Sequence, residues 1–596
     1  MISNQGRYGS PYQPFDRRQK YTARTILFIT MFSSSSAAFS GTERVNVDSG
    51  GAVANNQSYT PSISSEGRYV AFASPASNLV EEDINGRFDI FLHDRKTNST
   101  RRVSTDPEGA GGNKNSLYPS ISANGCNIAF ESNASNLVTK DTNGEYDIFV
   151  YDCETKLSER VSISSTGEQA NNSSKTPSLS AEGRYVAFTS SAINLVVDDT
   201  NGKTDVFVFD RETRVTERVS SSATGVGGND ASQNPSISEN GRFVAFESKA
   251  RNLSSNDANG KTDIFIFNRE TGVTERISVD STGIEGNKDS VNPSISADGR
   301  FVAFESEASN LVPNDTNKEA DIFVHDREAG TTQRISVNIA GEEGNGFSES
   351  PSISLDGRYV AFKSIASNLI PTDTNGLFDI FVHDRDTGRI QRVSVDSSGI
   401  EANNSSETPS ISADGQYVAY KSYANNLVPK DTNKKSDIFV NGPNKPPEFI
   451  SPATAVIAEN STTVLTLEAS DLDGDLIRFS ITGGIDGALF TVNATHQLSF
   501  LAAPDEKNPG DANADNIYEV EVTANDGHDG ASIQAIKVAV VNAEEFSRST
   551  PESINEKFGE PSSSSSGGGG TIGLLSLLCL LRGRVNRPSP LAADTK

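Results

Sequence analysis

The sequence predicts an all-β fold: a seven-bladed β-propeller closed by its N-terminal strand, followed by a β-sandwich. The tetrapeptide Pro-Ser-Ile/Leu-Ser recurs seven times, 58 residues apart, with no insertion or deletion between copies. Each unit carries four short runs of β-branched and aromatic residues bounded by Gly-containing turns, and helical periodicity is absent. Four-stranded units in a strict repeat are typical of a propeller. The copies begin at Pro61, Pro119, Pro177, Pro235, Pro293, Pro351 and Pro409.

Each unit is expected to form four antiparallel strands. In the fifth unit these are "PSIS" at 293–296, "RFVAFES" at 300–306, "DIFVHDR" at 321–327 and "TQRISV" at 332–337. Asp-Gly and Thr-Gly pairs between the runs are turn signals that join neighbouring strands. The repeat position of Ala71 holds Ala in all seven units, so each copy is expected to fill the same place in its blade.

The N-terminus supplies the strand that the seventh unit lacks. Val45 occupies the repeat position of Val103 and Val393, whereas the next residue in that position, Ser451, lies in a Pro-rich linker. Residues 42–48 are therefore expected to pair with residues 436–440, because this pairing joins the first and last blades and removes an exposed sheet edge.

Residues 42–441 resemble the TolB-type propeller repeat. The resemblance is carried by "SADGR(Y/F)VAF" and "DIFVHDR", which recur with small changes in most units. The chain contains no Trp, which argues against the Trp-Asp class of propellers.

Composition and the N-terminal text favour an exported protein. The chain has 596 residues, a formal net charge of −27 and a pI near 4.7, which disfavours nucleic acid as a partner because phosphate neutralisation needs clustered Lys and Arg. Residues 17–40 combine basic residues, a short apolar core and small residues that end at Ser40, the pattern of a secretory signal. The alternative is an unstructured leader before the propeller.

Two of the three cysteines are expected to form a disulfide. Cys126 takes the Arg position of "GRYVAF" and Cys153 the Arg position of "HDR", both in the second blade. Antiparallel pairing brings the start of the second strand opposite the end of the third. An oxidising compartment permits the bond, and Cys579 is left out of it. Two unrelated substitutions are the alternative.

Residues 447–543 resemble one cadherin module, through "PPEF", "DLDGDLIRFSI", "APDEKNPGD" and "VTANDG". The resemblance implies calcium, a cation that takes six to eight oxygen ligands. Its ligands would be Asp471, Asp473 and Asp526 at one edge and Glu459 at the other, although Lys507 replaces a family Glu at that second edge. The first edge could also use Asn441 or Asn444. Ordinary turn aspartates are the alternative.

The blades offer a second candidate calcium site. "DTNGEYD" and its copies place Asp, Asn and Asp at relative positions 1, 3 and 7, as calcium loops do, but without their further acidic residues. A hydrogen-bonded turn is the alternative, because Asx residues and Gly also suit turns. In the first two blades the residues are Asp83, Asn85, Asp89, Asp141, Asn143 and Asp147.

Catalytic motifs are missing from the sequence, so the expectation is that the protein is not an enzyme. Three of the five His share one repeat position, which holds Tyr, Phe or Asn in the other blades, and no nucleophile elbow or zinc-protease motif occurs. Loops around a propeller axis can still assemble a site, which leaves a lyase or glycosidase open.

The C-terminal residues 562–587 carry a Ser/Gly stalk, an apolar stretch at 571–581 and an Arg cluster. The apolar stretch is shorter than the roughly 20 residues of a membrane helix. The order resembles the Gly-Gly C-terminal sorting signal of Gram-negative bacteria, which implies processing by a rhomboid-type sorting protease. A marginal anchor helix left in place is the alternative.

Together these features predict a calcium-dependent binding or adhesion protein, exported to the cell surface or outer membrane, or secreted, in a Gram-negative bacterium. The propeller would be the platform for a protein or glycan ligand, and the C-terminal segment would contact the membrane. Alternatives are a periplasmic TolB-like envelope scaffold and a polysaccharide-active enzyme that uses the propeller axis. The expected parts are a signal peptide (1–40), propeller (41–442), cadherin-like domain (443–545), linker (546–570) and anchor with basic tail (571–596).

Overall fold

The computed structural model describes residues 41–429, 431–471, 476–527 and 530–548. These residues are nearly all β, as the sequence predicts, with one short α-helix and one 3₁₀ turn. The leader, Asp473, His528, Cys579 and the C-terminal sorting segment lie outside the described residues. Among the described residues, no helix is long and apolar enough to span a membrane.

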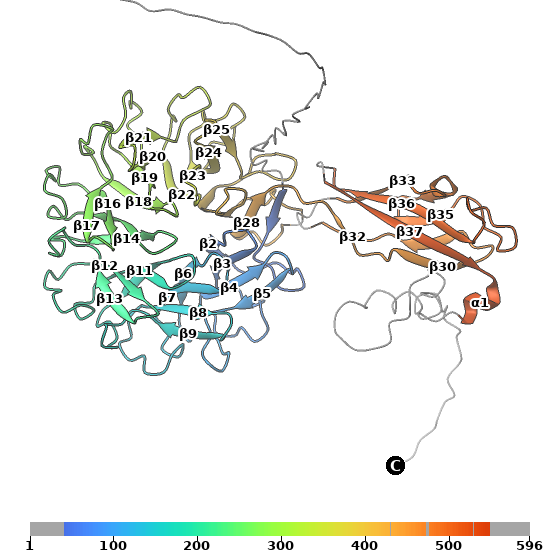
Figure 1. Cartoon of the computed structure of the whole chain (residues 1–596), viewed down its shortest axis with the longest axis horizontal. Helices are drawn as coiled ribbons and strands as arrows, with labels where there is room; N and C mark the ends of the chain where they lie inside the picture. The colour runs from blue at the N-terminus through green and yellow to red at the C-terminus, as the bar shows by residue number, and fades with distance from the viewer. Residues whose placement is uncertain (1–40, 430, 472–475, 528–529, 549–596) are drawn as a thin grey trace, which may run out of the picture. The chain divides into compact units, whose positions relative to one another are not determined.

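Seven four-stranded antiparallel sheets radiate around a common centre and form the propeller (Figure 1). The first three blades are β2 (Tyr59–Ile63), β3 (Tyr69–Ser74), β4 (Asp89–Asp94), β5 (Ser99–Arg102); β6 (Ser116–Ile121), β7 (Asn127–Ser132), β8 (Asp147–Asp152), β9 (Leu157–Arg160); and β10 (Ser174–Leu179), β11 (Tyr185–Ser190), β12 (Asp205–Asp210), β13 (Val215–Arg218). The next three are β14 (Ser232–Ile237), β15 (Phe243–Ser248), β16 (Asp263–Asn268), β17 (Val273–Arg276); β18 (Ser290–Ile295), β19 (Phe301–Ser306), β20 (Asp321–Asp326), β21 (Thr331–Arg334); and β22 (Ser348–Ile353), β23 (Tyr359–Ser364), β24 (Asp379–Asp384), β25 (Arg389–Arg392).

The seventh blade is closed by the N-terminal strand, as the sequence predicts. Strand β1 (Gly41–Arg44) completes the sheet of β26 (Ser406–Ile411), β27 (Val418–Ser422) and β28 (Asp437–Gly442). It runs antiparallel to β28, with Gly41 opposite Gly442 and Arg44 opposite Phe439. The strand starts one residue earlier and ends sooner than residues 42–48, because the chain turns into its next bridge, Val47 with Val53.

Each blade buries a stacked aromatic pair between its second and third strands. In the first blade Phe72 and Phe91 are fully buried and their ring centroids lie 5.8 Å apart. The other six blades repeat the pair at 5.9 to 6.1 Å, with Tyr420 replacing Phe in the seventh. Offset aromatic pairs add specific stabilisation to the buried area, which explains why this repeat position holds only Phe or Tyr.

Two hydrogen-bonded rings around the axis explain the Pro-Ser-Ile-Ser repeat. The Ile121 N–H donates to Ser62 Oγ of the preceding blade at 3.1 Å, and like positions repeat this bond in all seven blades. The second ring lies in the turn that follows each inner strand. There the Ala123 N–H donates to the Ala181 carbonyl of the next blade at 2.9 Å, and seven such bonds close the ring. Both rings are formed by residues of the innermost strands and of the turns that follow them, so the seven blades share one axis.

A two-layered β-sandwich follows the propeller in the chain. One sheet contains β30 (Thr454–Ala458), β37 (Ala531–Val541), β36 (Ile517–Asn525) and β33 (Arg478–Gly483), and the other contains β31 (Thr463–Thr466), β35 (Gln497–Phe500) and β34 (Phe490–Val492). Short elements are β29 (Glu448–Phe449), β32 (Ala469–Ser470), η1 (Gly487–Leu489) and α1 (Ala543–Arg548). The core between the sheets includes Leu498, Tyr518, Val522 and Ile536.

Candidate functional site

The Asp-Asn-Asp loops of the blades surround an arginine side chain. In the first blade Arg102 Nη1 lies 3.3 Å from Asp83 Oδ1 and 3.8 Å from Asp89 Oδ2. Asn85 Nδ2 donates to Asp89 Oδ2 at 2.6 Å, and its Oδ1 accepts the Arg87 N–H. Burial raises the pKa of Asp89 to about 6 despite these partners. The guanidinium supplies positive charge where a calcium loop would hold its ion, so this geometry favours the hydrogen-bonded turn.

The arginine recurs in all seven blades and was not singled out from the sequence. In the second blade Arg160 Nη1 lies 3.3 Å from Asp141, and Asn143 bonds Asp147 at 2.9 Å. The signal was present, since one repeat position holds Arg in every unit, namely Arg44, Arg102, Arg160, Arg218, Arg276, Arg334 and Arg392. In three blades a Glu joins the two Asp around this Arg, as Glu285 does at 2.5 Å from Arg276.

The described candidate calcium residues of the sandwich, Asp471, Asp526 and Glu459, lie at its two ends. Asp526 follows β36, and its Oδ1 and Oδ2 accept hydrogen bonds from the Gly530 N–H at 3.0 Å and from Asn444 Nδ2 at 2.8 Å. Asp471 follows β32. Glu459 lies beside Val541, its N–H donating to the Val541 carbonyl at 2.7 Å. Because Val541 and Asn525 are at opposite ends of the main sheet, Glu459 belongs to a different edge from Asp526.

The His of the propeller are interior groups. His93 and His325 place Nδ1 2.9 Å from the hydroxyls of Thr100 and Thr332. His383 faces Ile390 instead, and its buried Nδ1 has no hydrogen-bond partner among the described residues. Burial lowers the pKa of His93 and His383 to about 4. The same buried position holds Tyr or Phe in the second, third and fourth blades and Asn in the seventh.

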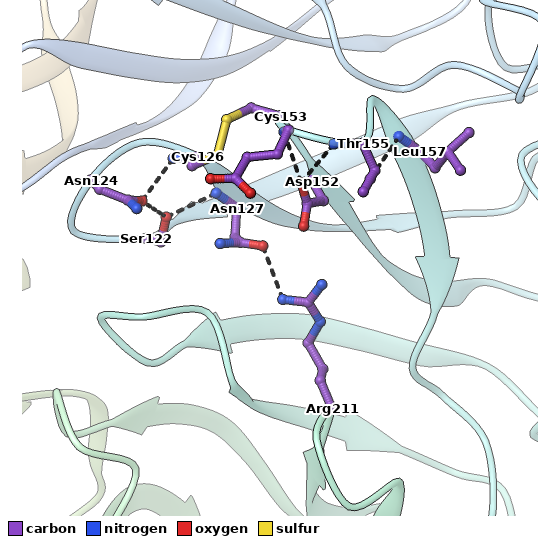
Figure 2. The surroundings of a disulfide bond; sticks show 10 residues. Ser122, Asn124, Cys126, Asn127, Asp152, Cys153, Thr155, Leu157 and Arg211 are labelled. Carbon is purple, nitrogen blue, oxygen red and sulfur yellow. Dashed lines mark hydrogen bonds between the residues drawn. A yellow bond between two sulfur atoms is a disulfide. The ribbon is translucent and has the colours of Figure 1, made fainter.

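A disulfide joins Cys126 and Cys153 across the second blade (Figure 2). The Cys153 N–H donates to the Cys126 carbonyl at 2.9 Å, so the two residues end a hydrogen-bonded strand pair. In other blades the equivalent Arg of "GRYVAF" bonds an Asp of the third strand, as Arg68 does with Asp94 at 2.7 and 2.8 Å. The disulfide therefore fastens the same edge by a covalent bond.

The two ends of the propeller differ in how far the repeats agree. We call the end where the inner strands begin the start face, and the end that carries the Ser-x-Asp-Gly turns the turn face. The repeat positions of the turns vary little, whereas at the start face the residue before each Pro and the residue before each third strand vary from blade to blade. The residue before each Pro has a positive φ, which shifts the strand register there; the seven are Thr60, Tyr118, Thr176, Asn234, Asn292, Ser350 and Thr408.

Aromatic side chains gather on the start face of four neighbouring blades, the sixth, seventh, first and second. We call this set the aromatic crescent. Tyr59 and Phe88 lie with ring centroids 5.8 Å apart, and Phe347 and Phe378 6.1 Å apart. Tyr118, Phe347 and Tyr423 expose 49%, 38% and 40% of their surface. The crescent consists of Tyr59, Phe88, Tyr118, Tyr146, Phe347, Phe378 and Tyr423.

Lysines are packed against the crescent. Lys421 Nζ lies 4.9 Å from the ring centre of Tyr59 and 4.8 Å from that of Tyr423, and it bonds Glu407 at 2.7 Å. Lys363 Nζ lies 4.9 Å from the ring centre of Phe378 and likewise bonds a Glu. Cation–π contacts of this kind hold the rings in fixed orientations.

Carboxylates and amides occupy the start face from the second blade to the fifth. Glu131 and Glu247 are 3% exposed, and each accepts the backbone N–H of the residue before Pro in the next blade, at 2.9 Å. Glu305 bonds Asn292 Nδ2 at 3.0 Å. Burial raises the pKa of Glu131 and of Glu305. The start face is thus aromatic and lysine-bearing on one side and acidic on the other.

The axis itself is narrowed by aliphatic side chains near the turn face. A cavity of about 140 Å³ lies there, next to Glu239 and Leu355. Its walls are the apolar residues of the Pro-Ser-Ile-Ser repeat, namely Ile63, Ile121, Leu179, Ile237, Ile295, Ile353 and Ile411.

No family model and no curated protein matches the chain. TolB from Acinetobacter baumannii is a similar solved structure, with 16% identity and a TM-score of 0.32 over 56% of this chain and 65% of TolB. A puromycin-hydrolyzing peptidase from Mycobacterium tuberculosis has 11% identity and a TM-score of 0.40 over 85% of this chain and 63% of the peptidase. Pyrococcus horikoshii acylaminoacyl peptidase has 13% identity and a TM-score of 0.37 over 72% of this chain and 56% of the peptidase. This chain covers less than two thirds of each of these structures.

The repeats form a propeller of seven four-stranded blades, as the sequence predicts. The expectation that the protein is not an enzyme is wrong as a conclusion from missing motifs, because peptidases are among the solved structures that resemble it. These likenesses transfer no catalytic residue to this chain.

Proposed function

We propose that this protein is an exported binding protein of the bacterial cell surface, and that the start face of its propeller binds a glycan. The observation that carries the proposal is the aromatic crescent, because it appears only in the repeat positions that differ between blades. A symmetric framework needs no exposed ring at these positions, since the corresponding residues of the third to fifth blades include Thr204, Thr262 and Ala320.

The chemistry of the face suits sugar rings. Exposed Tyr rings offer flat apolar surfaces at low entropic cost, together with hydroxyls that hydrogen-bond. The amides and carboxylates of the opposite side, such as Gln233 and Glu305, offer directional partners for hydroxyl groups. Ligand sites in general combine aromatic walls with a few placed polar groups.

Calcium dependence forms part of the proposal, at the sandwich edge with Asp471 and Asp526; Asp473, the third residue of this set, lies outside the described residues. Asp526 is 3% exposed and its Oδ2 is bonded to the amide of Asn444, so a bound cation would exchange this donor for an amide oxygen. Ligand binding to the folded state alone raises stability, which makes the melting temperature the reporter. Calorimetry that finds no calcium binding at millimolar concentration would remove this part.

A glycan array with and without calcium tests the proposal. We expect wild-type protein to bind a subset of glycans, and the Tyr118→Ala/Tyr423→Ala variant to lose at least tenfold in affinity. Val215→Ala/Val273→Ala is the matched control, because these valines are 49% exposed and begin the outer strands at the turn face. Capture of an envelope protein without any glycan binding would instead favour a periplasmic scaffold, and turnover of a glycan would favour an enzyme that uses the axis.

A further inference from the structure

Neighbouring blades are joined at the turn face by an arginine with three contacts. Arg327, which follows β20, donates through Nη1 to the Gly299 carbonyl at 2.7 Å and stacks 4.8 Å from the ring centre of Phe243. Its Nε and Nη2 both donate to Glu275 of the preceding blade, at 3.0 and 2.8 Å. This arginine–glutamate pair recurs as Arg95 with Glu43, Arg211 with Glu159 and Arg269 with Glu217.

Arg385 makes the first two contacts but has no glutamate. Its Nη1 donates to the Gly357 carbonyl at 2.6 Å, and its guanidinium lies 4.4 Å from the ring centre of Phe301. The repeat position of Glu275 is filled by Gln333, which is exposed. Arg385 Nε is buried and has no hydrogen-bond partner among the described residues. The side chain is therefore held in the orientation that binds a carboxylate, but Gln333 replaces the Glu that supplies this carboxylate at the four paired positions.

We infer that the seam between the fifth and sixth blades is a carboxylate-binding site, in which Arg385 receives an external carboxylate where its counterparts receive a Glu. A guanidinium presents two parallel N–H groups that match the two oxygens of a carboxylate. The ligand is an acidic side chain of a partner protein or the carboxylate of a uronic acid.

Nearby negative charge does not prevent this binding. The carboxylates of Asp326, Asp356 and Asp386 lie close enough to act on Arg385, together with the positive charge of Arg300. The third blade has acids at the same three positions, and Arg211 there still holds Glu159 at 2.5 Å. The four arginine–glutamate pairs between other blades therefore indicate that the group bound by Arg385 is a carboxylate.

The site is separate from the start face. Arg385 comes directly after Asp384, the last residue of β24, and this end of the strand lies at the turn face. Binding there does not depend on the glycan proposed for the aromatic crescent.

Thermal melting in acetate and in chloride at equal ionic strength tests the inference. Acetate should raise the midpoint of wild-type protein by about 1–2 °C relative to chloride. The Gln333→Glu variant supplies the carboxylate itself, so it should melt about 1 °C higher in chloride and gain nothing from acetate. Gln391→Glu is the matched control, because the arginine position of the next blade holds Pro443; this variant should gain from acetate as wild type does.

The source of the carboxylate is found with a tetragalacturonate and a tetraglutamate peptide as probes. The natural source is represented by the probe that binds wild-type protein and binds the Gln333→Glu variant at least tenfold more weakly. Equal acetate effects in all three proteins, no acetate effect in wild type, or binding of neither probe would each overturn the inference.

Discussion

Removal of residues 42–48 should prevent the propeller from folding as a cooperative unit. Val45 is fully buried, and burial of such a side chain contributes about 1.5–3 kcal/mol. The ion pair of Glu43 with buried Arg95 would be broken, at about 3–5 kcal/mol. Each lost backbone hydrogen bond to β28 adds about 1 kcal/mol. The total is on the order of 10 kcal/mol, which is comparable with the whole stability of a domain.

Circular dichroism during heating and urea unfolding measure this effect. We expect the truncated protein to show no cooperative transition, and a synthetic peptide of residues 41–54 added in excess to restore one. A peptide with Val45→Asp is the control, because it keeps the length but cannot fill the buried position. If the truncated protein melts at the wild-type midpoint, the N-terminal strand does not close the ring.

Three further outcomes follow from single blades. His383→Phe should be more stable than wild type at low pH, by a difference that grows as pH falls from 6.5 to about 4 and reaches at most about 3 kcal/mol. The reason is that the folded-state pKa of His383 is lowered to about 4, so protonation of the unfolded chain takes stability from the wild type over this range. His325→Phe should show the same pH trend from a lower starting stability in the same series of urea melts, because burial also lowers the pKa of His325 but the variant loses a hydrogen bond to Thr332. Reduction of Cys126–Cys153 should lower the free energy of unfolding by about 2–4 kcal/mol, and peptide mapping that finds two free thiols in exported protein would contradict the pairing. Arg102→Leu should cost about 3–5 kcal/mol because two buried Asp lose their positive partner, and an unchanged urea midpoint would show that the arginine is dispensable.

Most of the fold could be predicted from the sequence because the strand pattern of one blade recurs in seven copies. The seventh unit has no fourth strand after Phe439, and an extra strand lies around Val45. Because strands can be counted in the sequence, this mismatch predicted that the N-terminal strand closes the ring. The role of Arg102 was not predicted. Its partners Asp83 and Asp89 form a loop with the spacing of a metal site, and only the pairing of β4 with β5 brings the arginine between them.

The aromatic crescent could not be derived from the sequence. Its members come from different repeat positions, such as Tyr118 before a Pro and Phe88 at the start of a third strand. They share one face because the inner strand changes register at the positive-φ residue, Tyr118 having a φ of 49°. Such a shift at a residue other than Gly has no clear sequence signal, because β-strands normally alternate their faces without interruption.

The most direct test of the proposed function is the affinity of one array-selected glycan for wild-type protein and for the two paired variants, measured by calorimetry. Loss of binding in Tyr118→Ala/Tyr423→Ala, with Val215→Ala/Val273→Ala unchanged, is the predicted result, because only the first pair removes exposed rings of the aromatic crescent. Equal affinity in all three proteins would show that the start face is not the ligand-binding face and would contradict the proposal.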